Sequence, residues 1–373
     1  MSQAHRVRVA HRLSVLLAAF SFAACEPLSE ETPAREPAVP NDPALPIDAG
    51  EPVTEGGASA RDASPLAPTN DTTIEDAGAR SPPAPDAGGP PPYDAGAAAP
   101  LDGRYVSPAN TGWMPTGALL SPYTGPSNVI AAGTVIDGKD VSTCLTISAP
   151  NVTIKRSRIR CSGDYALYQG GGAQGLLVED VEITSASTAG AGEQSSVDRA
   201  MLFTDGATVR RAYVHGTRRG VALGDNTTIE ASYIGDNVNN TAAHSSAVAA
   251  WGGTKNVVLR NNNLSTAPNT MASSAASFYP ESGPNVGFTI VGNLFDTDGG
   301  YAMYVGYTPS AGESPNTSFQ ITDNWFGVRY HPECGSYGPV TNANDGLQAG
   351  GGTWQRNRWY APGTPKDGTL LPL

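Results

Sequence analysis

The chain of 373 residues is poor in several residue types, with 5 Met, 8 Phe, 5 His and 4 Cys. Charged residues make up 16% of it, below the quarter that is usual for globular domains. It has no CxxC pair, so a structural zinc site is not expected. P-loop, dinucleotide-binding glycine, HExxH and GxSxG motifs are also missing. These absences argue against nucleotide use, zinc proteolysis and α/β-hydrolase chemistry.

Positive charge is scarce as well, since the formal net charge is −12. The imbalance is concentrated in residues 26–100, which hold 14 acidic residues against 3 Arg. The remainder of the chain is nearly neutral and offers no broad basic face. A nucleic-acid partner is therefore not expected.

The N-terminus has the pattern of an export signal over residues 1–24, with three Arg followed by an apolar run from Leu13 to Ala24. No later segment reaches the roughly 18 apolar residues that a membrane span requires. Phe22-Ala-Ala-Cys25 resembles the lipobox of bacterial lipoproteins, in which the cysteine is acylated. The resemblance implies an exported protein anchored through lipid on Cys25 to a bacterial outer membrane or cell surface. The alternative is an ordinary secretory signal cleaved near Ala24.

Residues 25–100 have the composition of a disordered tether. Residues 26–100 contain 16 of the 31 Pro and a single aromatic residue, Tyr93. Such a segment cannot bury enough apolar area to offset the entropy lost on ordering. Asp-Ala-Gly occurs four times, but the repeats lack the dense oxygen ligands of a calcium loop, which favours a spacer over a metal site.

The remaining residues, 101–373, carry a repeat that indicates a solenoid. A short β-rich run ends in an apolar residue, and a second apolar residue follows five positions later. From Ile154 onward the repeat recurs every 20 to 33 residues, and Ile136/Val141 is an earlier copy. The clear pairs are Ile154/Ile159, Val178/Ile183, Val209/Val214, Ile229/Ile234, Leu259/Leu264, Ile290/Phe295, Ile321/Phe326 and Trp354/Trp359.

Asparagine occupies the same place in the last four repeats, three residues after the first apolar position: Asn262, Asn293, Asn324 and Asn357. Stacked Asn amides hydrogen-bond from one coil to the next, and Asn tolerates the left-handed backbone of a tight turn. We therefore predict an all-β fold, a single-stranded right-handed parallel β-helix of about nine coils. Leucine-rich repeats are the main rival, but their dense leucine pattern is absent.

Two early stretches carry a family resemblance: Thr134-Val-Ile-Asp-Gly-Lys-Asp140 and Asn151-Val-Thr-Ile-Lys-Arg-Ser-Arg-Ile159. With the repeat, they make residues 113–360 resemble exported bacterial β-helix proteins of the pectin-lyase-like superfamily. The resemblance implies a protein that handles acidic or neutral polysaccharide. That superfamily includes lyases, hydrolases, epimerases and non-catalytic surface proteins, so the fold does not settle the function.

Cys144 and Cys161 are separated by 17 residues, about one early coil, which places them within reach of a disulfide in an oxidising exterior. Cys334 is then left over in a turn-rich segment.

Superposing two repeats on Val209 and Ile229 predicts a candidate site, because it places Asp205 above Asp225, Asp198 above Arg218 and Arg199 above Arg219. Stacked carboxylates suit Ca²⁺ and adjacent arginines suit a uronate carboxylate. We assign candidate roles as follows: Arg218, Arg219 and His244 as catalytic; Asp198, Arg199 and Trp251 as substrate-binding; Asp205 and Asp225 as ligands of a possible Ca²⁺.

Each assignment has a structural alternative. The two stacked aspartates are also typical of turns, and Asp198 with Arg218 is also typical of a solvated ion pair. His244 lies where similar proteins often have His-x-Asp-Gly, but Ser246 and Ala247 replace the last two residues. A further set is suited either to stacking sugars or to covering a coil flank: Tyr279, Tyr301, Tyr304, Tyr307, Trp251 and Tyr337.

The sequence thus predicts a monomeric surface lipoprotein whose β-helix binds an acidic polysaccharide or cell-surface glycan. Cleavage is left open, with β-elimination by a polysaccharide lyase favoured over glycoside hydrolysis. The alternative function is a non-catalytic structural or adhesive protein of the envelope or matrix.

Overall fold

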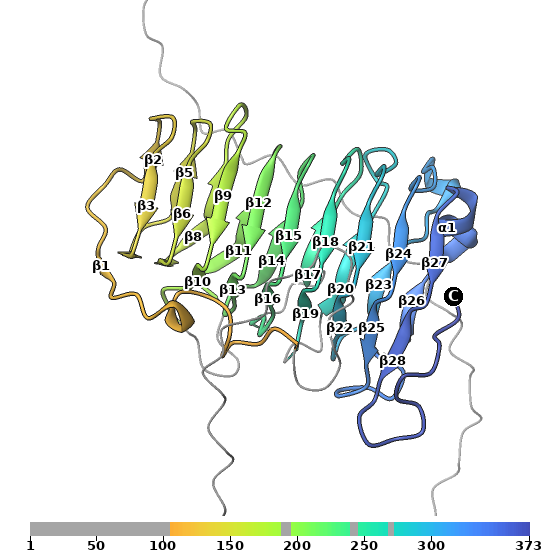
Figure 1. The fold of residues 1–373 in the computed structure, drawn as a ribbon. Helices are drawn as coiled ribbons and strands as arrows, with labels where there is room; N and C mark the ends of the chain where they lie inside the picture. Colours follow the sequence, from red (N-terminus) through yellow and green to blue (C-terminus); the bar gives the residue numbers. More distant parts are fainter. Residues whose placement is uncertain (1–104, 188–194, 239–244, 268–271) are drawn as a thin grey trace, which may run out of the picture. The chain divides into compact units, whose positions relative to one another are not determined.

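A computed structural model describes residues 105–187, 195–238, 245–267 and 272–373, and their strands form three parallel sheets (Figure 1). Sheet A consists of β1 (Ser121–Pro122), β4 (Lys139–Val141), β7 (Arg158–Cys161), β10 (Glu182–Ser185), β13 (Tyr213–Val214), β16 (Tyr233–Ile234), β19 (Asn263–Ser265), β22 (Leu294–Asp296), β25 (Trp325–Gly327) and β28 (Arg358–Tyr360). Sheet B consists of β2 (Asn128–Val129), β5 (Leu145–Ile147), β8 (Gly163–Gln169), β11 (Val197–Leu202), β14 (Arg219–Ala222), β17 (Ser245–Ala250), β20 (Ala272–Phe278), β23 (Tyr301–Tyr304) and β26 (Gly338–Thr341). Sheet C consists of β3 (Val135–Asp137), β6 (Thr153–Lys155), β9 (Leu176–Glu179), β12 (Ala207–Arg210), β15 (Thr228–Glu230), β18 (Val258–Arg260), β21 (Thr289–Val291), β24 (Gln320–Thr322) and β27 (Thr353–Gln355).

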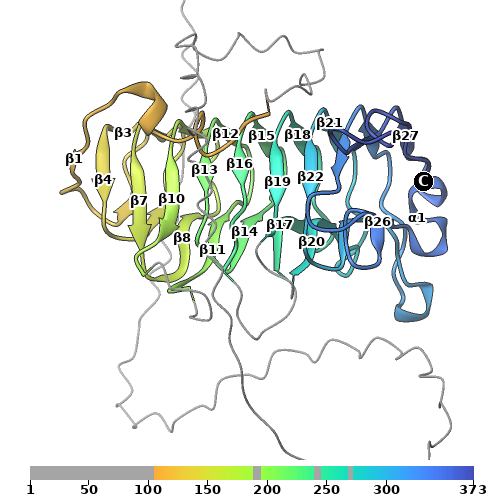
Figure 2. The same cartoon turned by 90° about the horizontal axis from the view of Figure 1, so that it is seen from below.

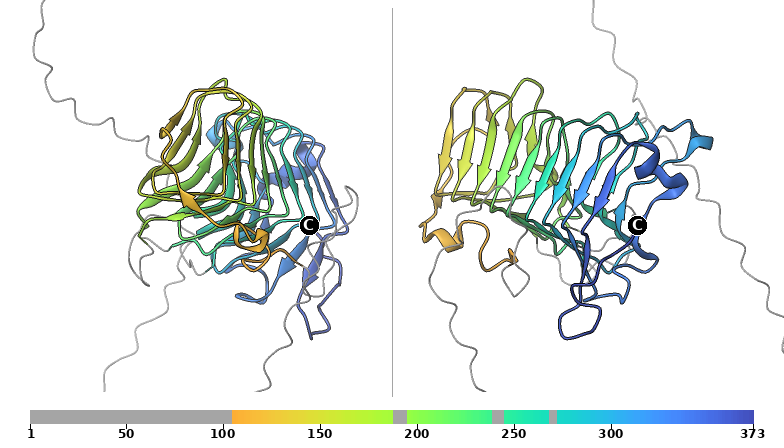
Figure 3. Two further views of the ribbon diagram at one scale, coloured as in Figure 1. Left: turned by 60° about the vertical axis from the view of Figure 1, so that its left-hand side comes forward. Right: turned by 45° about the vertical axis from the view of Figure 1, so that its right-hand side comes forward.

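Helical structure among the described residues is confined to short turns: η1 (Met114–Thr116), η2 (Pro309–Ala311), η3 (Ala343–Asp345) and α1 (Gly346–Ala349). The chain passes through sheets C, A and B in turn, and each coil lies on the one before it (Figure 3). The predicted right-handed parallel β-helix of about nine coils is therefore confirmed.

The predicted apolar pairs line the interior in register. In sheet C, Ile154 is paired with Ile136 on one side and Val178 on the other. In sheet A, Ile159 is paired with Val141 and Ile183. The five-residue spacing arises because two residues separate the sheet C strand from the sheet A strand in every coil from β6 onward.

These two-residue corners have a constant conformation. The first residue has a positive φ in each of them, as at Asp180, Asn261 and Asp323. The second residue is fully buried, and in the last four coils it is the predicted asparagine. The sequence-based explanation that these asparagines supply the left-handed backbone is wrong, because the residue before each of them does so.

The asparagines instead form a continuous hydrogen-bonded ladder. The Nδ2 of Asn262 donates to the Oδ1 of Asn293 at 2.9 Å, and Asn293 repeats the bond to Asn324 at 3.0 Å. The Nδ2 of Asn324 donates in turn to Asn357 at 3.0 Å. The Oδ1 atoms of Asn293, Asn324 and Asn357 also accept the backbone N–H of the asparagine one coil earlier, so the amides lock neighbouring corners together.

A second, shorter ladder was not foreseen from the sequence. Asn285 and Asn316 lie in the connections from sheet B to sheet C, and the Nδ2 of Asn285 donates to the Oδ1 of Asn316 at 2.9 Å. Both side chains are buried. In the core beside them Phe288 and Phe319 stack with ring centroids 4.6 Å apart. The later coils are thus fixed at two corners.

Residues 105–113 cross the outer side of sheet A as a strap (Figure 2). Tyr105 packs in an apolar cluster with Leu294, Trp325 and Tyr360. Farther along the strap, the Nε1 of Trp113 donates to Glu182 at 2.7 Å. The strap therefore links the C-terminal coils to β10, a contact that no repeat pattern predicted.

No helix in the described part of the chain is long and apolar enough to cross a membrane. The predicted signal peptide, the lipid-bearing Cys25 and the tether of residues 25–100 lie outside the described residues.

Replacing Asn293 with alanine tests the ladder. The change leaves the buried backbone N–H of Asn262 and the carbonyl of Leu259 without their side-chain partner. We expect the free energy of unfolding to fall by about 2–4 kcal/mol in urea denaturation. Gln320→Ala, on the exposed side of the neighbouring strand β24, is the control and should change it by less than about 0.5 kcal/mol. Equal effects of the two variants would contradict a structural role for the ladder.

Candidate functional site

The predicted arginines meet on sheet B. Tyr165, Arg199 and Arg219 lie on the adjacent strands β8, β11 and β14 and are direct pairing partners. All three side chains are half-buried, whereas Leu167, Met201 and Val221, two positions on, face the core. The predicted stacking of Arg199 on Arg219 is therefore present in the fold.

Asp198 joins this pair to a third arginine. Its Oδ1 accepts a hydrogen bond from the Nη1 of Arg218 at 2.8 Å, and its Oδ2 lies 3.5 Å from the Nη1 of Arg219. The side chain of Arg218 is 19% exposed and that of Arg219 is 26% exposed, so both are partly withdrawn from water. We call Arg199, Arg218, Arg219 and Asp198 the arginine group. It contains three guanidinium groups and one carboxylate.

Arg199 is the least compensated member of the arginine group. Its guanidinium carbon lies 4.7 Å from the ring centroid of Trp251 and 6.0 Å from that of Tyr165. Burial, and next the positive charge of Arg219, lower the pKa of Arg199 below its ordinary value. A guanidinium remains charged in proteins, so this desolvated cation is suited to an incoming anion.

A small surface pocket adjoins these residues and is lined by Arg199, Arg219, Gly220, Val221, Ser246, Ala249 and Trp251. A larger pocket lies at the C-terminal end of the β-helix, where Leu347, Trp354 and Leu370 are among its lining residues. Arg356 is the one charged residue in that lining. The chemistry therefore favours the surface around the smaller pocket as the candidate binding site, since the pocket itself, at about 10 Å³, has room only for a water-sized group.

Asp205 and Asp225 are adjacent, as predicted, but they lie in the turns that lead from sheet B to sheet C. The carboxylate of Asp205 accepts hydrogen bonds from the side-chain amides of Gln174 and Asn226. The Oδ1 of Asp225 accepts the backbone N–H of Lys255 at 2.9 Å. Within the described residues, no three His, Cys, Asp or Glu side chains are grouped to hold a metal ion. A role in calcium binding stays a prediction, and these bonds are typical of turn residues.

His244, the third predicted catalytic residue, lies outside the described residues. Trp251 follows β17 and reaches Arg199, so the structure brings these two predicted substrate-binding residues together.

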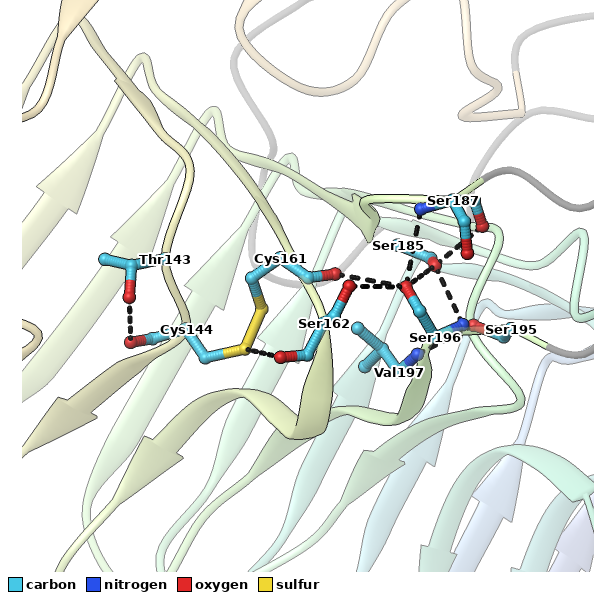
Figure 4. The surroundings of a disulfide bond; sticks show 9 residues. All are labelled: Thr143, Cys144, Cys161, Ser162, Ser185, Ser187, Ser195, Ser196 and Val197. Carbon is cyan, nitrogen blue, oxygen red and sulfur yellow. Dashed lines mark hydrogen bonds between the residues drawn. A yellow bond between two sulfur atoms is a disulfide. The ribbon is translucent and has the colours of Figure 1, made fainter.

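Cys144 and Cys161, the pair suggested by their spacing, form a disulfide with Cα atoms 5.3 Å apart (Figure 4). The bridge joins the residue before β5 to the end of β7, near a group of serine hydroxyls before β11. Cys334 is buried and its Sγ lies 3.4 Å from the carbonyl oxygen of Phe295. Burial raises the pKa of its thiol well above the ordinary value, which makes Cys334 a poor nucleophile.

Asp296 at the end of β22 is a buried acid that sequence analysis missed. It is 7% exposed, and its Oδ1 has no hydrogen-bond partner among the described residues. Gly327 makes room for it, since a Cβ there would come within 2.7 Å of the Asp296 Cγ. Burial raises the pKa of this carboxyl to about 7, although Arg329 acts in the opposite direction. An aspartate in a turn-rich sequence gives no signal that distinguishes this environment.

Comparison of the chain with protein-family models, curated proteins and solved structures finds no match. The site therefore has to be interpreted from its own geometry.

Asp296 should make stability depend on pH. Because its folded-state pKa is raised above the ordinary carboxyl value, the folded protein binds this proton more tightly than the unfolded chain. The contribution of Asp296 to stability is complete below about pH 4 and is lost as the pH rises to about 7. Asp296→Asn should therefore raise the free energy of unfolding at pH 8 by roughly 1–3 kcal/mol and change it little at pH 4.

The matched control is Asp164→Asn, since Asp164 is exposed on β8. Urea denaturation of both variants at the two pH values checks the prediction. An equal response of the two variants at pH 8 would show that Asp296 is not the group responsible.

Proposed function

We propose that the protein binds an acidic polysaccharide on sheet B through Arg199, Arg218 and Arg219. A parallel β-helix fits a polysaccharide-binding protein, because its stacked strands present a long, regular row of side chains. The observation that carries the proposal is the arginine group itself, with three guanidinium groups for one carboxylate. Arginine pairs with carboxylates through two parallel hydrogen bonds, which suits a uronate.

The aromatic rings beside Arg199 add a second kind of contact. Trp251 and Tyr165 lie beside its guanidinium group. Their rings offer apolar area to the face of a sugar ring that is formed by C–H groups. In this arrangement the arginines recognise charge and the rings hold the sugar in place.

If the protein cleaves its ligand, the site favours β-elimination over hydrolysis. Hydrolysis uses a pair of carboxyl groups across the scissile bond, whereas the one carboxylate in the arginine group, Asp198, is held by Arg218 and Arg219. In β-elimination a base removes the proton alpha to the uronate carboxylate, the bond to the leaving sugar oxygen breaks as a carbon–carbon double bond forms, and the leaving oxygen takes up a proton from the protonated base or from water. Arg218 and Arg219 would stabilise the charge that develops on the carboxylate, and His244 is proposed as the base.

We further propose, from the export signal and the lipobox-like Phe22-Ala-Ala-Cys25, that the protein is an acylated surface protein. In this proposal residues 25–100 act as a spacer that carries the β-helix away from the membrane. The resemblance to the pectin-lyase-like superfamily supports the same class of ligand.

Arg199→Gln should weaken binding of polygalacturonate by about 10- to 100-fold, because it removes a charge-assisted contact from a partly buried site. Raising the ionic strength should weaken binding by the unaltered protein as well. Arg160→Gln makes the same change in charge at an exposed position on sheet A and should leave affinity unchanged. Isothermal titration at two salt concentrations measures both effects. Equal binding of a neutral polymer such as unsubstituted glucan would contradict the proposal.

β-Elimination predicts an unsaturated product that absorbs in the ultraviolet when polygalacturonate is incubated with the protein, with and without Ca²⁺. Arg219→Gln should abolish the signal, and His244→Ala should slow it by at least about 100-fold because it removes the proposed base. A flat absorbance trace with binding retained would rule out the lyase and leave the non-catalytic, adhesive function.

A further inference from the structure

A second group of aromatic rings lies along sheet B, and its first member, Tyr279, occupies the position next to Trp251 in the following coil. Tyr304 lies between Tyr279 and Tyr301, with ring centroids 5.4 Å and 5.3 Å away, and Tyr301 lies 5.7 Å from Tyr337. We call these four residues the tyrosine group. Tyr337 is 76% exposed and is the one aromatic among the large, exposed hydrophobic side chains of the described chain. An exposed ring at the edge of a ring cluster offers a flat apolar surface on which a ligand can stack.

The pairing register places the two groups in one line. Arg199 is paired with Arg219, Ser246 with Ser274, and Ser274 with Tyr301. Because Val221 is paired with Val248, Arg219 and Ser246 are aligned as well. We call this line of aligned residues across the strands the column; it consists of Arg199, Arg219, Ser246, Ser274 and Tyr301. Arg199 and Tyr301 are therefore four coils apart along the axis, which corresponds to about 19 Å at the usual strand spacing. Figure 2 shows strands β8, β11, β14, β17 and β20 side by side.

The residues between the two groups are short and uncharged. Ser246 and Ser274 occupy the column itself, and their Oγ atoms each hydrogen-bond to the Oγ of Ser277, at 2.7 Å and 2.6 Å. These hydroxyl groups are buried and satisfied by one another. Because both serines are buried, the side chains of the column that reach the surface are Arg199 and Arg219 at one end and Tyr301 at the other.

The tyrosine group is also electrically different from the arginine group. Burial raises the pKa of the Tyr279 hydroxyl above its ordinary value, so this ring is neutral at physiological pH. The charged group that acts on Tyr279 is the carboxylate of Glu281, which would repel an anionic sugar. Neutral rings suit the apolar face of an uncharged sugar unit.

We propose that Tyr279, Tyr301, Tyr304 and Tyr337 form a second subsite, which binds neutral sugar units of the same chain whose anionic unit is held by Arg199. The ligand class is thus a heteropolysaccharide that carries both anionic and neutral sugars, extended along the axis of the β-helix. This inference rests on the proposed function, because it assigns the tyrosine group to the ligand of the arginine group.

Binding of oligosaccharides of graded length tests the second subsite. The probes are fragments of a glucuronoxylan, in which uronate units are sparse, and fragments of polygalacturonate, in which every unit is anionic. Tyr337→Ala should lower the affinity for long glucuronoxylan fragments by about tenfold, because it removes an exposed stacking surface. It should leave the affinity for short fragments and for polygalacturonate unchanged, since these do not place a neutral sugar on the tyrosine group.

The matched control is Tyr307→Ala, since Tyr307 follows the same strand, β23, but is not part of the tyrosine group. Tyr337 is exposed, so its replacement should not impair folding, and the thermal unfolding midpoint checks this. Arg199→Gln should weaken the binding of fragments of every length.

The outcomes separate the two proposals. If Arg199→Gln weakens binding and Tyr337→Ala has no effect on long glucuronoxylan fragments, the second subsite is wrong and the proposed function stands. Equal losses for Tyr337→Ala and Tyr307→Ala, or a loss for Tyr337→Ala on polygalacturonate, would also overturn the subsite. If Arg199→Gln changes nothing, the proposed function itself fails.

Discussion

The hydrogen bonds between stacked asparagine amides hold the last four coils in a fixed register, and the positions of the side chains on those coils depend on that register. Asn262, Asn293, Asn324 and Asn357 are completely buried, so each amide must find its partners inside the protein. The partners exist only if neighbouring coils are aligned, because an Oδ1 must meet both the backbone N–H and the Nδ2 of the preceding asparagine. A slip of one residue would break these bonds and turn the apolar side chains outward.

The same corner carries a conformational cost that burial of its second residue helps to offset. In every coil from β6 onward, the residue before the buried corner residue has a left-handed backbone, and in several coils it has a full side chain, such as Arg156, Arg211 or Arg356. A left-handed residue other than glycine costs roughly 1–2 kcal/mol. At these corners the arginines also form ion pairs, Arg156 with Asp137 and Arg356 with Asp323. Burial of the following residue and the ion pair on the surface together hold the turn in one conformation.

Register also explains how a functional surface can be built from residues that are distant in sequence. Asp198 and Arg218 are 20 residues apart, yet they are adjacent in space because one coil separates them. The sheet places charged residues at one end of a column and aromatic residues at the other, with short serines between them. A long ligand that lies along the axis contacts several coils at once, so weak contacts with single sugar units add up.

Much of this architecture was determined by the sequence itself. The five-residue spacing of the apolar pairs and the period of the asparagines were sufficient to predict the β-helix, the coil length and the stacking of Arg199 on Arg219, because a solenoid converts sequence period directly into spatial contact. The tertiary structure alone decided the strap over sheet A, the placement of Trp251 against Arg199, the grouping of the four tyrosines and the burial of Asp296. These features depend on connections of irregular length and on side-chain directions, which have no period. Their burial and contacts are fixed only when the whole set of coils has packed together.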